Sequence, residues 1–196
     1  SDEQALAVVD KVEAEIGPID ILVNSAGAAA RTPADELTPA IWRAAMDAKY
    51  FSYINVIDPV IKRMSMRGSG AVINIIGNGG KIASPFHLAG GSANAALMLA
   101  SVGLANAYAG KGVRVVGLNP GLTETDRVAE GLKAAAKATG STEEEALADA
   151  LRRIPIGRMA DPTDIANVVA FLSSTKASYV TGVVISMDGA QVPIVV

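Results

Sequence analysis

The chain has a single histidine, His87, and it stands seven residues before Asn94. Seven residues are two helical turns, so both side chains share one helix face if the helix extends back to His87. An imidazole suits proton exchange near neutral pH, and the amide of Asn94 can hydrogen-bond to a reacting group. This pair is the first candidate for chemistry. The alternative is that His87 is a loop residue at a helix entrance.

A metal centre is not expected in this chain. The sequence has one histidine and no cysteine, and its acidic residues cluster only at 143–145, on a helix face that we expect to be solvated. Without cysteine there is no disulfide framework, so we expect a reducing compartment, the cytoplasm. The first four residues are acidic and polar, and no signal peptide is expected.

Charge and composition argue against two classes of partner. The net charge is -3 and the pI about 5.2, so there is no basic surface for nucleic acid and no polybasic patch for a membrane. Residues 92–109 carry no charge, but polar side chains and many alanines dilute this stretch. We expect a doubly buried or interface helix there rather than a membrane span.

The chain alternates helices and strands over 196 residues, enough for one domain spanning 1–196. Its strands are nearly continuous apolar runs, as in sheets covered on both faces. The expected fold is therefore α/β, a doubly wound parallel sheet. Expected strands are 19–24, 71–76, 113–119 and 183–187; expected helices are 3–15, 39–66 with a bend near Pro59, 84–109, short helices within 124–153, and 162–173 capped by Asp161.

Two of these strands run into similar turns, at Asn24-Ser25-Ala26-Gly27 and at Asn119-Pro120-Gly121. With Asn74-Ile75-Ile76-Gly77 and the closing run from Gly157 to Gly189, they form four landmarks in order. On these residues the chain resembles the short-chain dehydrogenase/reductase family over nearly its whole length. The resemblance implies a Rossmann-like sheet that binds NAD or NADP at the carboxyl ends of its strands.

The resemblance also implies which residues meet the cofactor. Asn24, Ala26 and Gly27 would line the cofactor cleft, and a second loop would surround the nicotinamide end: Pro120, Gly121, Thr123 and Thr125. The alternative for the first loop is that Asn and Gly are simply good strand exits.

The family's catalytic side chains are replaced here. The resemblance places the family serine at Gly77, the tyrosine at Gly90 and the lysine at Asn94, with the spacing intact. The family's asparagine on the preceding helix falls on Lys49. A substitute set of His87, Lys49 and Asn94 would support carbonyl reduction by a modified route, with Lys49 supplying the cation from across the cleft.

Three alternatives stay open at this point. Lys49 is a solvated or structural amine in one of them, and Tyr50 or Tyr53 is the proton donor in another, although neither has the family's spacing. The third is a catalytically inactive homologue that keeps the fold for binding or assembly. The primary hypothesis is an NAD(P)-dependent oxidoreductase that acts on a small alcohol or ketone.

The family's N-terminal strands and Gly-rich phosphate loop have no counterpart in the sequence. The run Gly77-Asn78-Gly79-Gly80-Lys81 fails the fingerprint, because its third glycine would fall at Ile82. We expect that such a segment precedes this sequence in the molecule; the alternative is a truncated chain. Without it, a sheet edge would be exposed, and the residue that distinguishes NAD from NADP is not visible.

Assembly and substrate access are the remaining expectations. The resemblance implies a homodimer or homotetramer through the helices 39–66 and 84–109 and the strand 183–187. Residues 129–151 are polar and alanine-rich, as in a mobile lid. The substrate would be a small molecule, and no motif identifies it.

Overall fold

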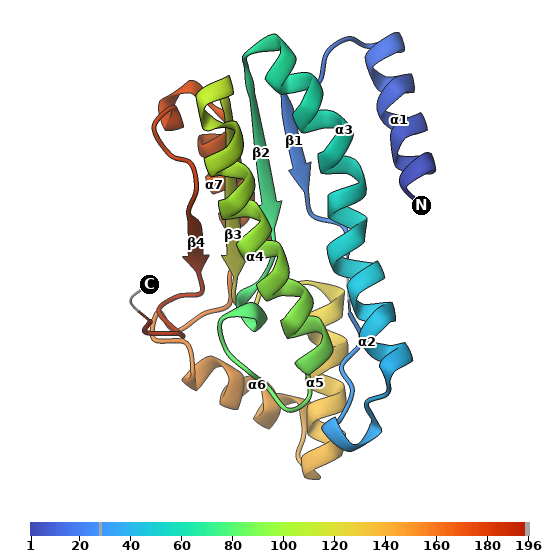
Figure 1. Cartoon of the computed structure of the whole chain (residues 1–196). Helices are drawn as coiled ribbons and strands as arrows, with labels where there is room; N and C mark the ends of the chain where they lie inside the picture. The colour runs from blue at the N-terminus through green and yellow to red at the C-terminus, as the bar shows by residue number, and fades with distance from the viewer. Residues whose placement is uncertain (28, 195–196) are drawn as a thin grey trace.

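Four parallel strands form the centre of the molecule. A computed structural model describes residues 1–27 and 29–194 and orders the strands β1-β2-β3-β4. Their bounds are β1 Ile21–Asn24, β2 Gly70–Ile75, β3 Val113–Pro120 and β4 Val184–Met187. The register pairs Ile21 with Ala71, Gly70 with Val113 and Gly117 with Val184. All four strands therefore end at one edge of the sheet, on the side of α5 and α6 (Figure 1).

Helices cover the sheet and connect its strands. The longer ones are α1 Asp2–Glu15, α2 Pro39–Ala45, α3 Ser52–Arg67, α4 Leu88–Tyr108, α5 Asp126–Thr139, α6 Glu143–Arg152 and α7 Pro162–Ser173. One-turn elements lie at Ala34–Glu36, Asn78–Gly80, Ala109–Lys111 and Thr175–Ala177, and a π-helical turn lies at Met46–Phe51. The parallel α/β fold expected from the sequence is confirmed.

The two faces of the sheet bury separate apolar clusters. Alternate strand residues such as Val72 and Val115 pack with α1, α3 and α4. Their neighbours in sequence, such as Ile73 and Val116, pack with α7. Side chains on a strand alternate between faces, which explains why these strands are apolar without interruption and why both faces need helices.

A chain of buried polar groups joins β1, β2 and α4. The Asn24 amide donates to Asn74 Oδ1 (2.9 Å), and the Asn74 amide donates to Ser101 Oγ (2.9 Å). Ser101 in turn donates to the carbonyl of Leu97 one turn earlier (2.7 Å). Because an unpaired amide in a dry core is costly, this chain fixes the two strands and the helix against one another.

Helix boundaries differ from the sequence expectations in two places that matter for the site. The long helix expected at 39–66 departs from α-helical geometry at Met46–Phe51, whereas Pro59 lies inside α3. The expected helix at 84–109 starts at Leu88, so His87 is its N-cap residue and not part of the helix. Asp161 caps α7 as expected, accepting from the Thr163 amide (2.7 Å).

Helix α4 is the one segment among the described residues that is long and apolar enough, by length and composition, to cross a membrane. In the structure it packs on the sheet and buries eight residues, including the polar Asn94 and Ser101.

Strand β1 forms one edge of the sheet, and among the described strands it pairs with β2 alone. Ile21 and Val23 are 48% and 41% exposed there.

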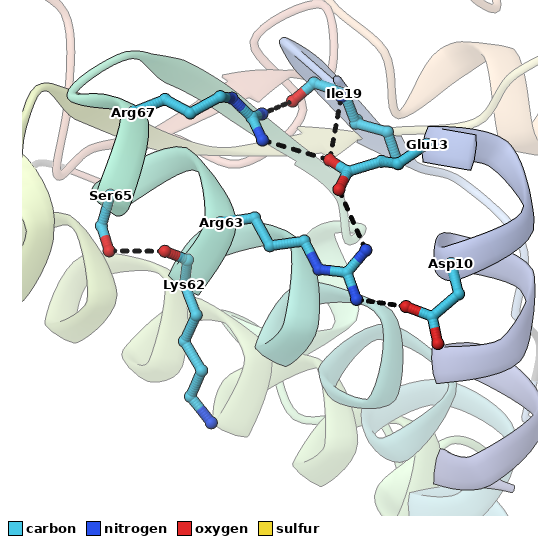
Figure 2. Close-up of polar contacts among 7 residues, drawn as sticks. All are labelled: Asp10, Glu13, Ile19, Lys62, Arg63, Ser65 and Arg67. Carbon is cyan, nitrogen blue, oxygen red and sulfur yellow. Dashed lines mark hydrogen bonds and ion pairs between the residues drawn. The ribbon is translucent and has the colours of Figure 1, made fainter. Parts of the chain in front are cut away.

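Helix α1 is held to α3 by an ionic cluster (Figure 2). The Glu13 carboxylate accepts from Arg63 (2.9 Å), from Arg67 (3.1 Å) and from the Ile19 amide (3.1 Å). Arg63 also pairs with Asp10. The Ile19 amide, together with the two guanidinium groups, holds the pKa of Glu13 below its usual range.

Glu13→Gln is expected to lower the stability of the folded chain by about 1 kcal/mol, which is roughly 2–4 °C in the melting temperature. The carboxylate's contribution is complete above the pKa of an unfolded glutamate and disappears as pH falls through the lowered folded pKa. The difference from wild type should therefore shrink below about pH 4.

Glu15→Gln is the matched control in the same thermal melts, since Glu15 pairs with Lys11 on an exposed surface (4.0 Å). A control as destabilised as Glu13→Gln, or a difference independent of pH, would contradict this role for Glu13.

Candidate functional site

The carboxyl ends of β1, β2 and β3 gather the residues that could do chemistry. The loop after β2 is fixed at its start, because the Ile76 amide donates to the Leu118 carbonyl (2.7 Å). The Gly77 amide then donates to Asn119 Oδ1 (3.3 Å). The position expected for a family serine is therefore held against the end of β3, without a side chain of its own.

Lys49 reaches this edge from the π-helical turn between α2 and α3. Its side chain is buried, with the residue 7% exposed. The ammonium group donates to the Ile75 carbonyl and to Tyr53 Oη, each at 3.1 Å. Ile75 is the last residue of β2, two before Gly77. Lys49 is thus neither solvated nor remote: its charge lies at the end of β2.

His87 fills the space left by two glycines. A Cβ placed on Gly90 would lie 2.2 Å from His87 Cε1 and 2.7 Å from Nε2. A Cβ on Gly79 would lie 2.9 Å from His87 Cδ2. The imidazole therefore occupies the volume that a side chain at position 90, the expected tyrosine position, would need.

Asn94 completes the group from the second turn of α4. A Cβ on Gly77 would lie 3.6 Å from Asn94 Nδ2, and a Cβ on Gly79 would lie 3.4 Å from the same atom. Asn94 and His87 therefore flank Gly79. The expectation that they share a helix face is wrong, because α4 begins after His87; the loop Asn78–Gly80 brings them together instead.

The three predicted catalytic residues thus surround one short segment, from Ile75 to Gly79. Lys49 lies at its start, and Asn94 and His87 lie along its length. An ammonium group, an amide and an imidazole at one strand end offer a positive charge, a hydrogen-bond donor and a titratable proton. This is a set of groups that suits stabilisation and protonation of a developing oxyanion.

The first predicted cofactor loop contains both packed and exposed residues. The amide of Asn24 is turned into the sheet toward Asn74. Gly27 has a φ of 147°, and a Cβ there would lie 2.9 Å from the Ala48 carbonyl oxygen. Only glycine allows this approach to the π-helical turn. Ser25 and Ala26, between them, are exposed.

The second predicted loop continues from β3. Pro120 pairs with Met187, and the Gly121 amide donates to the Met187 carbonyl (2.9 Å). Thr123 donates to the Gly121 carbonyl and Thr125 to the Thr123 carbonyl, both at 3.3 Å. Thr125 is exposed and is the N-cap residue of α5.

Three exposed residues at this edge offer backbone and hydroxyl groups to a ligand: Ser25, Ala26 and Thr125. Close packing also requires glycine in the loop after β2 and in the first turn of α4. A Cβ on Gly80 would lie 2.7 Å from the Ala95 amide nitrogen, and one on Gly91, in α4, would lie 2.6 Å from the Gly79 carbonyl oxygen.

One contact at the site was not anticipated from the sequence. Asn78 donates to Asp188 Oδ2 (2.9 Å), which also accepts from the Val192 amide (3.2 Å). A Cβ on Gly121 would lie 2.9 Å from Asp188 Cα. Asp188 therefore connects the loop after β2 to the loop after β3. Among the side chains that the structure describes, no three metal-ligating groups cluster.

Comparison with known proteins gives a consistent picture. Residues 1–190 match the family model described as enoyl-(acyl carrier protein) reductase. The cis-4-hydroxycyclohexanecarboxylate dehydrogenase of Sinomonas cyclohexanicum is 32% identical over 189 residues, covering 96% of this chain and 72% of that protein. Sorbitol-6-phosphate 2-dehydrogenase of Erwinia amylovora superposes with a TM-score of 0.93 at 27% identity, covering 98% of this chain and 76% of that one.

A second similar structure carries a cofactor. The gluconate 5-dehydrogenase of Burkholderia cenocepacia J2315, solved in complex with NADP and tartrate, superposes with a TM-score of 0.86 at 30% identity. The superposition covers 100% of this chain and 73% of that one.

Gly90→Ala is expected to displace the His87 imidazole, because a Cβ would overlap the ring at 2.2 Å. The NMR chemical shifts of the His87 ring protons should change. Gly103→Ala is the control in the same helix, since nothing lies within 4 Å of its Cβ position. There the substitution should leave the His87 signals unchanged and stabilise α4 by up to about 1 kcal/mol. Unaltered His87 ring-proton shifts in Gly90→Ala would refute this placement of the ring.

Proposed function

The chain belongs to the short-chain dehydrogenase/reductase family, and we propose that it is an NAD(P)-dependent oxidoreductase of a small alcohol or ketone with a rearranged catalytic set. The relatives named above are dehydrogenases of small hydroxylated compounds. One of them binds NADP. These names support the class of reaction and leave the individual substrate open.

The observation that carries the proposal is the placement of His87 over Gly90. Where the family has a proton-donating tyrosine, this chain has a glycine and an imidazole in the vacated volume. A second exchange accompanies it. The family's lysine position holds Asn94, on α4, and the family's asparagine position holds Lys49, on the π-helical turn. One cation and one amide therefore remain, but they have exchanged places.

In the proposed reaction, His87 gives a proton to the carbonyl oxygen of a ketone as that oxygen gains negative charge. Asn94 donates a hydrogen bond to the same oxygen, and the Lys49 ammonium group lowers the energy of the developing anion from the end of β2. NAD(P)H, when bound, supplies the hydride that the carbonyl carbon receives. One hydride and one proton convert the ketone to the alcohol.

The cofactor would lie along the carboxyl edge of the sheet. Ala26 and Gly27 would meet it from the loop after β1, beside the buried Asn24. The loop after β3 would hold the nicotinamide end through Pro120, Gly121, Thr123 and Thr125. Both loops start at strands whose register is fixed, so their spacing is preset.

The absence of side chains at Gly77 and Gly90 favours a second candidate, a non-catalytic member of the family that binds NAD(P) or assembles with other chains. The two candidates agree on the fold. They differ in turnover, and in whether His87 and Lys49 matter for it.

Pairing of two copies through α4 is part of the proposal. Leu99 and Val102 on this helix are 77% and 40% exposed, and apolar side chains of this size favour burial in an interface. Light scattering of the purified protein is expected to give two or four times the mass of one chain. A monomer at micromolar concentration would contradict this part.

His87→Gln is expected to lower kcat for ketone reduction by about 10²–10⁴-fold, because glutamine keeps a hydrogen bond but cannot transfer a proton. Lys49→Met should lower kcat by about 10²-fold, since it removes the charge beside the oxyanion. Dissociation constants for NADH and NADPH, from fluorescence titration, should stay close to wild type in both variants.

Lys111→Met is the matched control, because Lys111 is an exposed lysine beyond the far end of α4. It should turn over like wild type in a screen of small ketones with NADH and NADPH in turn. Cofactor binding without turnover in wild type would favour the non-catalytic candidate. Turnover that neither His87→Gln nor Lys49→Met alters would rule out the rearranged set.

A further inference from the structure

Tyr53 is a buried polar neighbour of Lys49, and no role in the reaction as proposed above falls to it. It stands four residues after Lys49, at the start of α3, and is 1% exposed. Three hydrogen bonds join its hydroxyl group, the Lys49 ammonium group and the Ile75 carbonyl at the end of β2. The geometry of these contacts shows which atom donates in each.

The phenol proton is committed to the backbone. Tyr53 Oη lies 2.6 Å from the Ile75 carbonyl oxygen, which can only accept, so the hydroxyl donates there. Its lone pairs are then left to accept from the Lys49 ammonium at 3.1 Å. Lys49 donates to the Ile75 carbonyl as well, at 3.1 Å. The three groups form a closed triangle.

The ring adds a fourth contact. Lys49 Nζ lies 4.6 Å from the centroid of the Tyr53 ring, within the range where an aromatic ring attracts a cation. Burial raises the pKa of the Tyr53 phenol, so the hydroxyl stays neutral at physiological pH. Tyr53 therefore holds the ammonium group through its hydroxyl dipole and its aromatic ring, and not through a negative charge.

The same geometry excludes Tyr53 as the proton donor to substrate. Its proton points into the Ile75 carbonyl, and its side chain has almost no exposed surface. Any effect of Tyr53 on the reaction must pass through Lys49. A lysine side chain has a long flexible stem and loses much rotamer freedom when it is fixed, so a fixed cation requires contacts of this kind.

The π-helical turn at Met46–Phe51 belongs to the same arrangement. Lys49 lies within this turn and Tyr53 follows it in α3. Turns of this kind alter the angle between successive side chains and are frequent at functional sites. Here the turn aims Lys49 and Tyr53 at one carbonyl, that of Ile75.

We propose that Tyr53 is a positioning residue that fixes the ammonium group of Lys49 at the end of β2, where the carbonyl oxygen of the substrate would gain its charge. This inference rests on the proposed function for its catalytic consequence. Its structural part, an ordered ammonium group, does not depend on turnover.

The first test needs no substrate. In protein labelled with ¹⁵N-lysine, the Lys49 ammonium group should give a resolved, slowly exchanging proton–nitrogen signal, identified by its loss in Lys49→Met. Exposed Lys111 should give none at the same temperature. Tyr53→Phe, which keeps the ring and removes the oxygen, should broaden the Lys49 signal beyond detection.

The second test is kinetic. Tyr53→Phe is expected to lower kcat by about tenfold, with KM and NAD(P)H affinity within twofold of wild type. Tyr108→Phe is the matched control, because Tyr108 is the last residue of α4, at the opposite end of that helix from the site. It should change neither the Lys49 signal nor kcat.

The outcomes separate this inference from the proposed function. Turnover unaffected by Lys49→Met would refute the catalytic role of Lys49. The Lys49 ammonium signal would still show whether Tyr53 fixes that group in place. A kcat that falls in Lys49→Met but not in Tyr53→Phe would overturn the role of Tyr53. So would a Lys49 signal that survives in Tyr53→Phe, or one that is absent in wild type; the wild-type result stands even if Tyr53→Phe fails to fold.

Discussion

The buried hydrogen-bond chain from Asn24 through Asn74 and Ser101 to the Leu97 carbonyl is the constraint on which the candidate site depends. Each side chain in this series donates a hydrogen bond to the next group, so a shift of one strand by a single residue would leave amides unpaired in a dry core. The chain sets β1 against β2, and it sets α4 against both. Since Lys49 contacts the end of β2 and Asn94 projects from α4, their relative placement follows from it.

In the proposed function, the catalytic groups of the family have changed position rather than disappeared. Removal of the side chain at position 90 left a volume, and His87 fills it from the cap of α4. The cation lies on the π-helical turn and the amide on α4, the reverse of the family's order. Tyr53 gives the displaced cation two fixed partners, its own hydroxyl and the ring beneath.

Much of the fold could be predicted from the sequence because local signals agreed with the global pattern. The apolar runs marked all four strands, and Asp161-Pro162 marked the start of α7 through its cap. The start of α4 was misplaced because Ser84-Pro85 resembles a helix start, whereas the helix begins at Leu88. A bend was expected near Pro59, whereas the helix departs from α-helical geometry at Met46–Phe51. The π-helical turn there was not predicted, since hydrogen bonds shifted by one residue leave no mark in composition.

The candidate site was only half visible in the sequence. The single histidine and the displaced lysine could be found by spacing, and the structure brings both to the loop after β2. Tyr53 was named only as an alternative proton donor. Its contact with the Ile75 carbonyl and the contact between Asn78 and Asp188 could not be found, because both depend on the tertiary approach of distant segments. In the sequence, a tyrosine four residues after a lysine is typical of an ordinary core residue. Only the tertiary structure shows that its hydroxyl contacts the end of a strand.

We propose that this protein transfers a hydride with a proton donor other than tyrosine. The most direct measurement is isotopic: incubate the protein with NADH or NADPH deuterated at the transferable position and a panel of small ketones, and analyse the alcohols by mass spectrometry. We expect one deuterium on the carbinol carbon of at least one product. Cofactor binding with no deuterium transferred to any product would contradict it and would leave a binding protein with the fold of an oxidoreductase.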